Sequence, residues 1–457
     1  MSALESPKKS LTTIKMAATS PSCYFSSIEL LNIKSFGQPP QVLDFKLPCG
    51  TLSQWTLLLG DNGVGKTTIL QCLAEMSAKL TCPIKFLNEE NEAPVYRPKL
   101  DNHLKNGQNK IPYARVGGKD SCITVRFAKN AELGQPVSLV ENTQTCVTAD
   151  VIKGSLRSYN LIDDKCALLQ PCGYGAFRRF GNTKLGAELN PDSCSTLFDD
   201  NEPLLNVEEW LLRSDYAATK SKDARAEKRL KSIKKLLVNF LPEVEDIRIK
   251  PSGTDVPTPE AKTPDGWVPV RSLSTGYRAT MAWVTDFAAR MLDRYPESPD
   301  PFSEPAVVLV DQIDTHLHPK WQRQLIQDLS QSFPATQFIV TAHSPLMVLA
   351  MPDANMAVLR RKGEHVLICN HPDDVKGWRV DQIIASNLFE EQPTRDINTQ
   401  DMLEERRTLL SKNKITKQQQ ARLKELNEWA SGIPTADTPE DIRAMEILRR
   451  ASAKIKD

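Results

Sequence analysis

The chain has 457 residues, and its 58 Lys and Arg nearly balance 57 Asp and Glu, which gives a formal net charge of +1. With 40% hydrophobic residues it is neither collagen-like nor wholly disordered, and it contains no apolar run of the roughly 18 residues that a membrane span needs. The near-zero charge argues against a protein that coats nucleic acid by bulk electrostatics, although it leaves room for a local basic patch.

Residues 1–22 are rich in Ser, Thr, Ala and Lys and predict a flexible tail without the apolar segment of a secretory signal. The 10 cysteines include no C-x-x-C pair, which argues against a zinc-ribbon or thioredoxin-type site. Scattered cysteines of this kind are typical of core residues or free thiols in a reducing compartment. We therefore expect a cytoplasmic protein.

Strand signals precede a helix in the next part of the chain. Alternating apolar and polar residues predict strands over 25–33 and 42–47, and 55–59 is a short, fully apolar strand. A Gly-rich turn follows, and then a helix from 66 to about 78. From about 82 to 170, Pro, Asn and Gly clusters separate short strands such as 122–127, which is typical of an irregular β-rich insertion.

The remaining sequence predicts helices and a parallel sheet. A helical stretch covers 207–241, and its segment 220–235 holds eight Lys and Arg against two acids. With helices between them, three apolar runs imply a mostly parallel sheet: 267–270, 306–310 and 337–341. The last 80 residues are polar and helical, with a helix start at Thr438.

The turn at 60–67 matches the phosphate-binding pattern G-x-x-x-x-G-K-[ST] between an apolar strand and a helix. Its glycines let backbone N–H groups point at phosphates, and the helix adds its positive N-terminal end. We expect Lys66 to reach the β- and γ-phosphates of ATP, and the Thr67 hydroxyl to bind Mg²⁺. The predicted nucleotide-binding residues of this segment are Gly60, Asp61, Asn62, Gly63, Val64, Gly65, Lys66, Thr67 and Thr68.

Three further motifs accompany this loop. The apolar run 307–310 ends in Asp311, the arrangement of a Walker B motif, and Asp311 would hold Mg²⁺ through water. The alternative is a buried strand that ends at a capping Asp. Because the same chain contains the phosphate loop, the Walker B interpretation is favoured over it. Residues 273–277, Leu-Ser-Thr-Gly-Tyr, begin a helix with a small, polar first turn, and 338–343 is a strand that ends in His343.

By order and spacing, these motifs resemble the four nucleotide motifs of ABC-type ATPases. The resemblance implies an α/β P-loop NTPase of the ABC-ATPase head type, with a mixed or parallel sheet, a β-rich N-terminal part, a helical insertion and a helical C-terminal tail. It also implies that Ser274, Thr275 and Gly276 form the signature motif and that His343 is the switch histidine. Such subunits hold each ATP between the phosphate loop of one copy and the signature helix of the other. A head-to-tail dimer, or a higher even oligomer, is therefore expected.

Combined with the pattern, the resemblance sets the expected domain boundaries. We expect a tail over 1–22, an ATPase head over 23–370 and a helical C-terminal region over 371–457. The head would include an insertion over about 82–265, with a helical lobe over 205–241. The polar tail 400–457 would either offer a surface to a partner or cap the sheet.

Residues 311–322 and 341–345 look like the soluble RecF/Rad50/OLD-like ATPases rather than transporter subunits. Segments 173–180, 208–212 and 378–383 resemble AAA-family ATPases of bacterial anti-phage defence, such as the ATPase subunit of Septu systems. This resemblance covers most of 25–455 and implies a partner effector, an HNH or other nuclease. The same family text at His316 and His318 implies a loop at the dimer interface rather than a zinc site.

The family pattern has Glu where this chain has Gln312. Gln can hold the attacking water but cannot accept its proton, and loss of a general base typically costs about 10²–10⁴-fold. We therefore predict intact ATP binding, slow turnover and ATP-trapped dimers, with Asp311, Gln312 and His343 as the catalytic positions. Whether Gln312 is a deliberate substitution or a natural feature of a slow switch stays open.

The alternative function is that of a DNA-binding ATPase in repair, like RecF or Rad50. The basic segment 220–235 would then contact phosphates, as Arg178 and Arg179 would. Charge runs on helices are more often solvated faces, and either arginine could instead approach ATP. The lack of long coiled coils in the sequence argues against an SMC or Rad50 role.

Overall fold

A computed structural model describes residues 22–76, 78–80, 96–98, 120–129, 131–135, 145–152, 155–159, 170–179, 192–221, 224–251, 257–372, 375–389, 396–412 and 416–430. The chain forms two compact units. The first runs to Ile383 and includes Asn387–Phe389, and the second takes the other residues from Ile384 onward. The strands described below belong to the first unit.

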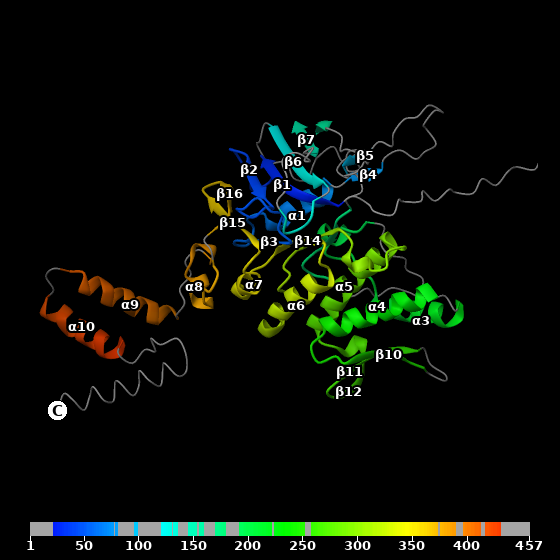
Figure 1. The fold of residues 1–457 in the computed structure, drawn as a ribbon. Helices are drawn as coiled ribbons and strands as arrows, with labels where there is room; N and C mark the ends of the chain where they lie inside the picture. The colour runs from blue at the N-terminus through cyan, green and yellow to red at the C-terminus, as the bar shows by residue number, and fades with distance from the viewer. Residues whose placement is uncertain are drawn as a thin grey trace, which may run out of the picture. The chain divides into compact units, whose positions relative to one another are not determined.

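A six-stranded sheet forms the centre of the first unit (Figure 1). In spatial order its strands are β16 (His365–Asn370), β15 (Asn355–Lys362), β3 (Trp55–Leu59), β14 (Thr336–Thr341), β13 (Ala306–Val310) and β9 (Cys172–Tyr174). Neighbouring strands are parallel, except that β16 runs antiparallel to β15. Every residue of β3, β13 and β14 is buried, which explains why their sequences are near-continuous apolar runs.

Two hydrophobic cores lie on opposite faces of this sheet. Leu57 and Val308 belong to a core shared with α3 to α7, whereas their chain neighbours Leu58 and Leu309 belong to a core shared with α1 and the N-terminal strands. This alternation follows from the pleat of a strand, which points successive side chains to opposite faces. In chain order, the helices of this part are α1 (Lys66–Glu75), α3 (Val207–Ser221), α4 (Ala224–Phe240), α5 (Thr275–Arg294), α6 (Pro319–Ser332), α7 (Pro345–Ala350) and α8 (Val380–Ile384), with short 3-10 helices η3 (Ser195–Leu197), η4 (Val270–Ser272), η5 (Pro301–Ser303) and η6 (Asn387–Phe389).

An antiparallel sheet covers the α1 side (Figure 1). Its order is β2 (Gln41–Asp44), β1 (Cys23–Leu31), β6 (Asp120–Lys129), β7 (Thr145–Ile152) and β8 (Ser155–Tyr159), while β4 (Ala78–Leu80) and β5 (Tyr96–Pro98) form a separate pair. The predicted strand at 122–127 lies within β6, which pairs along β1. Part of the segment that looked like an insertion therefore completes the N-terminal sheet.

One prediction about a strand was wrong. The run 267–270 does not join the parallel sheet: it falls on β12 (Gly266–Pro269), in an antiparallel sheet with β10 (Asp246–Lys250) and β11 (Thr258–Thr263). The residues of β12 are only half-buried, because β12 is an edge strand that, among the described strands, pairs with β11 alone. A strand of the central parallel sheet would be covered on both faces. The helical stretch predicted over 207–241 is confirmed, and it consists of two helices, α3 and α4, which pack side by side because each has its own apolar stripe to bury (Figure 1).

The described residues of the second unit form two helices, α9 (Ile397–Leu410) and α10 (Lys417–Ala430). Arg422 donates to Glu405 at 2.9 Å and Arg406 donates to Asn427 at 2.7 Å, so polar contacts join the two helices. Leu409 and Leu426 are the buried apolar residues of this pair. The helix start predicted at Thr438 lies outside the described residues. Among the helices that the structure describes, none is long and apolar enough to cross a bilayer.

Candidate ATP site

The loop 60–67 connects β3 to α1 as its sequence pattern requires. Gly60, Gly63 and Gly65 have φ angles of 136°, 76° and 100°, in the left-handed region that other residues rarely adopt. Gly65 is also the N-cap of α1 and has no side chain with which to cap it. The first N–H groups of the helix are therefore left to an anion, as at other phosphate-binding helix starts.

Lys66 holds the loop together from inside. Its ammonium donates to the carbonyl oxygens of Gly60 at 2.6 Å and Asp61 at 2.8 Å, and the side chain is buried. Burial lowers the pKa of this amine, while Asp311 is the first of the carboxylates that oppose the shift. The Lys66 ammonium therefore closes the loop on itself through two carbonyl oxygens, and the same side chain lines the pocket in which we expect the phosphates.

Asp311 follows β13 and lies beside the phosphate loop. Its Oδ2 accepts from the Thr67 hydroxyl at 2.7 Å, and its Oδ1 accepts from the Thr341 hydroxyl at 2.6 Å. Thr341 also accepts from the backbone N–H of Gln312 at 2.7 Å. The ends of β13 and β14 are thus joined through one threonine hydroxyl that the sequence reading did not single out.

Gln312 has a φ of 48°, a left-handed conformation that is uncommon for a residue with a side chain. Its Oε1 accepts from the Thr315 hydroxyl at 3.2 Å, within the turn that follows β13. Arg178 donates to the carbonyl oxygens of both Asp311 and Gln312. Arg179 instead points to Asn201, at 3.5 Å, and does not contact this segment.

The start of α7 is attached to the same turn. Asp314 Oδ2 accepts from the backbone N–H groups of His343 at 3.0 Å and Ser344 at 2.8 Å. Burial, and then the nearby Lys66, lower the pKa of His343, so its imidazole is neutral at pH 7. A neutral imidazole can donate one hydrogen bond and accept another, which suits a contact with a phosphate oxygen.

One pocket of about 360 Å³ gathers most of the predicted residues. It is lined by Lys34, Ser35, Asn62, Gly63, Gly65, Lys66, Thr67, Thr68, Asp311, Gln312 and His343. Lys34 and Ser35 were missed, because they follow β1 far earlier in the chain and carry no motif. Ser35 donates to the Val64 carbonyl at 3.1 Å, so this turn supports the loop directly.

The predicted signature residues do not line that pocket. Ser274 caps α5 by accepting from the Tyr277 N–H, and both Ser274 and Thr275 are exposed. Gly276 is buried, and a Cβ added there would lie 2.4 Å from the His316 carbonyl oxygen, so only glycine allows this close approach. Within one chain the signature segment thus faces outward, supported by the turn after β13.

His316 and His318 have separate structural positions. His318 Nδ1 accepts from the Lys320 N–H at 3.3 Å and caps α6, while His316 has a φ of 65°. No cluster of three or more metal-ligating side chains occurs among the residues that the structure describes. The imidazole at 318 therefore works as a helix cap.

The residues present fit a nucleoside triphosphate with magnesium. The uncapped helix start and the buried Lys66 supply donors for phosphate oxygens. Thr67 and Asp311 present a hydroxyl and a carboxylate 2.7 Å apart, the oxygen ligands that Mg²⁺ prefers. A buried strand leads into the phosphate loop and helix, and the polar ends of two further parallel strands lie beside them. The molecule is therefore a P-loop ATPase, and its site resembles those of ABC-type ATPases.

Comparisons with known proteins agree with this class. Residues 27–148 match an AAA domain family, and residues 187–349 match an AAA domain family described with the AbiEii toxin of type IV toxin–antitoxin systems. The chain is 26% identical over 369 residues to the Septu protein PtuA of Bacillus mycoides, which covers 80% of this chain and 45% of that protein. The chain thus resembles the ATPases of Septu defence systems.

Two retron proteins are also similar. The Retron Ec83 probable ATPase of Escherichia coli is 27% identical over 241 residues, which is 52% of this chain and 42% of that protein. The Retron Vc95 probable ATPase of Vibrio cholerae is 23% identical over 354 residues, which is 66% and 68% of the two chains. The chain spans less than half the length of the first two relatives. A solved SMC head bound to ScpA covers 76% of this chain and 97% of its own at 17% identity, with a TM-score of 0.43 that is too low to bear on function.

Proposed function

We propose that this chain is a cytoplasmic ATP-operated switch of a Septu-like anti-phage defence system. Two copies close head-to-tail around ATP and Mg²⁺, and the closed state controls a partner effector, an HNH or other nuclease. The similarity to Septu and retron ATPases supports the setting. The exposed Ser274 and Thr275, which lie outside the pocket of their own chain, support a site completed by a second copy.

One observation supports the proposal: the pocket brings together the residues expected to bind phosphate and magnesium, but position 312 in it carries a carboxamide instead of a carboxylate. Lys66, Thr67, Asp311 and His343 supply donors and oxygen ligands, so ATP should bind well. Gln312 can orient a water through hydrogen bonds but has no basic oxygen to take its proton. The chemistry of the site therefore favours a long-lived ATP complex.

Turnover measurements on position 312 test this reading. Gln312→Glu restores a carboxylate of nearly the same shape, and we expect ATP hydrolysis to rise about 10²–10⁴-fold, the usual contribution of a general base. Gln312→Ala is the matched control and should give no gain. Phosphate release per subunit is the measurement. If Gln312→Glu turns over no faster than the parent protein, position 312 does not limit hydrolysis.

ATP-dependent pairing is tested at the signature helix. Ser274→Glu places a negative charge where the triphosphate of a second copy would lie, and we expect it to abolish the ATP-induced dimer. Ser272→Glu, an exposed change two residues earlier, is the control and should pair normally. Light scattering with and without Mg·ATP gives the mass in each case. A dimer that Ser274→Glu leaves intact would contradict the head-to-tail arrangement.

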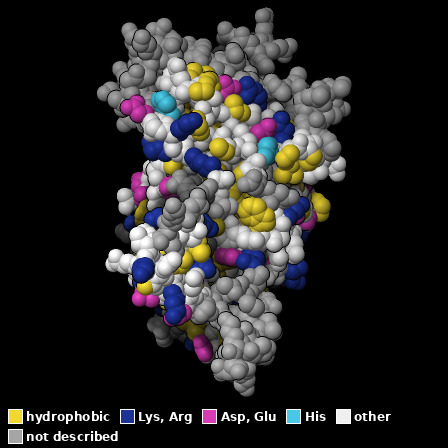
Figure 2. Space-filling model, turned by 90° about the vertical axis from the view of Figure 1, so that its left-hand side faces the viewer, with side chains coloured by type: hydrophobic (Ala, Val, Ile, Leu, Met, Phe, Trp, Pro, Cys, Tyr) yellow, Lys and Arg dark blue, Asp and Glu magenta, His cyan; other side chains and the backbone are white. Residues whose placement is uncertain are grey.

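The second candidate, a DNA-binding repair ATPase, has less support. Within the described part of 220–235, three of the basic side chains are already engaged: Arg225 with Glu297, Lys228 with the Pro299 carbonyl and Arg229 with Asp293. On the face shown in Figure 2, basic and acidic side chains are interspersed. Filter binding of duplex DNA at two salt concentrations tests this function, since phosphate contacts weaken steeply with salt.

A further inference from the structure

Arg178 is buried beside the ATP site but does not line the ATP pocket. The residue is 5% exposed, and it follows β9 in the turn that runs past the end of β13. From the sequence alone, this side chain is expected to contact either ATP or DNA. Neither accounts for a guanidinium that is enclosed by protein and absent from the pocket lining.

The donors of Arg178 reach three backbone carbonyls. One terminal nitrogen donates to the carbonyl oxygens of Asp311, at 2.9 Å, and of Gln312, and Nε donates to the Gly175 carbonyl at 3.2 Å. On the preceding strand, the Tyr174 carbonyl accepts from the Asp311 N–H at 2.8 Å. The segment 174–178 therefore binds this turn through two kinds of group: the Tyr174 carbonyl accepts from the Asp311 N–H, and Arg178 donates to the carbonyl oxygens of Asp311 and Gln312.

The backbone that Arg178 holds is strained. Gln312 has a φ of 48° and Arg178 itself a φ of 38°, so two residues with side chains occupy the left-handed region in direct contact. Such conformations persist only where surrounding contacts enforce them, and they gather at functional sites. The contacts around this turn include the hydrogen bonds from the guanidinium to the carbonyl oxygens of Asp311 and Gln312, and the bond from the Gln312 N–H to Thr341.

We propose that Arg178 is the positioning residue of the catalytic turn: it fixes the left-handed backbone at position 312, and so aims that side chain at the attacking water. The part of this inference that concerns hydrolysis rests on the proposed function. A guanidinium suits the task because its planar fork presents several donors in fixed directions, whereas an ammonium concentrates its charge at one point. Burial lowers the pKa of Arg178 to about 10, so it keeps its charge at neutral pH, beside Asp311 and Asp314.

The first test uses the nucleotide-free protein and backbone hydrogen exchange over 310–314. In the native structure the N–H groups of Asp311, Gln312 and Ile313 donate to Tyr174, Thr341 Oγ1 and the Thr341 carbonyl. Arg178→Met removes the donors but keeps an unbranched apolar side chain that reaches about as far as Nε, and we expect exchange of these amides to rise at least tenfold. Arg179→Met, a change at the neighbouring exposed arginine, should leave exchange there as it is.

The second test separates positioning from phosphate binding. In the Gln312→Glu background, Arg178→Met should lower kcat about 10²-fold, the scale expected when a reacting group is misplaced by about 1 Å, with the Kd for ATP unchanged within about threefold. Methylguanidine added to Gln312→Glu/Arg178→Ala should recover part of kcat, because it can supply the missing donors. A merely structural loss would not respond to it.

Each outcome decides something different. Unchanged exchange over 310–314 in Arg178→Met overturns the inference, whatever the kinetics show. A tenfold or larger loss of ATP affinity also overturns it, since Arg178 would then be a phosphate ligand. If Gln312→Glu alone fails to hydrolyse ATP, the proposed chemistry fails, but the exchange experiment still judges Arg178. Should Arg178→Met not fold, Arg178→Lys keeps the charge with fewer donors, and intermediate exchange supports the inference while native exchange contradicts it.

Discussion

Asp311 uses both of its carboxylate oxygens inside the protein, one for Thr67 and one for Thr341. The two contacts orient the carboxylate in different ways. Thr67 belongs to the phosphate loop and is itself an expected magnesium ligand, whereas Thr341 is fully buried at the end of β14. Partners of the second kind fix the direction of a metal-binding side chain, and their loss typically costs about 10–100-fold in metal affinity.

Thr341→Val therefore makes a sharp test at the scale of one side chain. Valine keeps the shape but loses the hydroxyl that donates to Asp311 and accepts from Gln312, so we expect Mg·ATP affinity to fall about 10–100-fold. Thr336→Val on the same strand is the matched control, because the buried hydroxyl of Thr336 has no hydrogen-bond partner among the described residues. Titration with a fluorescent ATP analogue and Mg²⁺ measures both variants. Equal affinities would mean that Thr341 does not orient Asp311.

The sequence pattern predicted the residues of this site that belong to local motifs. Lys66, Thr67, Asp311, Gln312 and His343 lie around one pocket. Thr341, Ser35 and Arg178 could not be assigned in the same way, because their importance arises from contacts across 29 or more positions of sequence. A hydroxyl or a guanidinium without a spacing rule gives no signal until the strands are placed.

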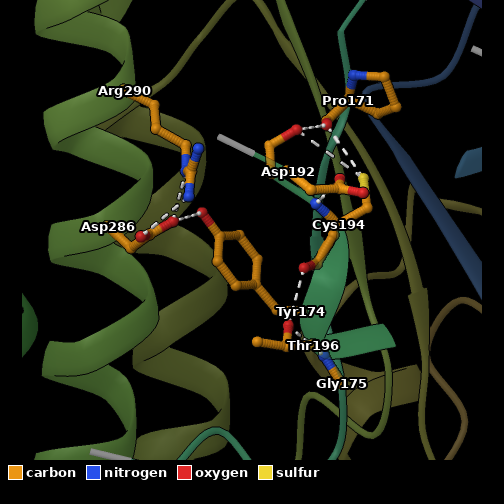
Figure 3. Close-up of polar contacts among 10 residues, drawn as sticks. Pro171, Tyr174, Gly175, Asp192, Cys194, Thr196, Asp286 and Arg290 are labelled. Carbon is orange, nitrogen blue, oxygen red and sulfur yellow. Dashed lines mark hydrogen bonds and ion pairs between the residues drawn. The ribbon is translucent and has the colours of Figure 1, made fainter. Parts of the chain in front are cut away.

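At the scale of elements, α5 is tied to β9 by a buried polar cluster (Figure 3). The Tyr174 hydroxyl donates to Asp286 Oδ2 at 2.9 Å, and Arg290 Nε donates to the same oxygen at 2.7 Å. Burial, together with Asp286, raises the pKa of Tyr174, so the phenol stays protonated and remains the donor. The helix that begins at the signature residues is thus anchored to the strand beside Asp311.

Stability measurements on this cluster check the link. Tyr174→Phe removes one hydrogen bond to a charged group and should cost about 1.5–3 kcal/mol of unfolding free energy. Asp286→Ala leaves the partly buried Arg290 without this carboxylate and should cost more, about 3–5 kcal/mol. Tyr216→Phe, at a side chain that is 66% exposed, is the control and should change little. Urea unfolding ranks the three, and a Tyr174→Phe value near zero would show that the contact contributes nothing to the native state.

The central strands of the six-stranded sheet were predictable from their sequences, and the reason lies in burial. β3, β13 and β14 are covered on both faces, so their apolar runs stand out in the sequence. β12 has an equally short apolar run but pairs only within a small antiparallel sheet. Nothing local distinguishes a strand that joins the central sheet from one that does not, because the difference lies in which partner it meets.

At the scale of the whole molecule, the candidate ATP site belongs to one of the two units alone. The residues that line the ATP pocket all belong to the first unit. The described helices of the second unit are polar, with Ile397 and Leu410 of α9 exposed at 76% and 56%. Apolar side chains that stand singly on a polar helix pair are ordinary features of a protein surface.

A chain that ends after Phe389 tests whether the second unit supports the ATP site. Because no residue lining the ATP pocket is removed, we expect the Kd for Mg·ATP to stay within about threefold of the full-length value, with the fold retained by circular dichroism. Full-length protein with Arg422→Glu, which breaks the contact of Arg422 with Glu405 and loosens the α9–α10 pair, serves as the comparison. Loss of ATP binding on truncation would show that the second unit supports the site after all.

The position of β3 has a consequence for how the protein is made. β3 carries the phosphate loop, yet its two neighbours in the sheet are β14 and β15, which the ribosome adds some 280 or more residues later. During synthesis both edges of this apolar strand therefore wait without partners, and ATP has no finished pocket with which to stabilise the nascent chain. Pairings so distant in sequence form slowly and leave apolar edges open to aggregation. Expression of this protein should accordingly depend on chaperones that protect the strand until residue 362 has emerged.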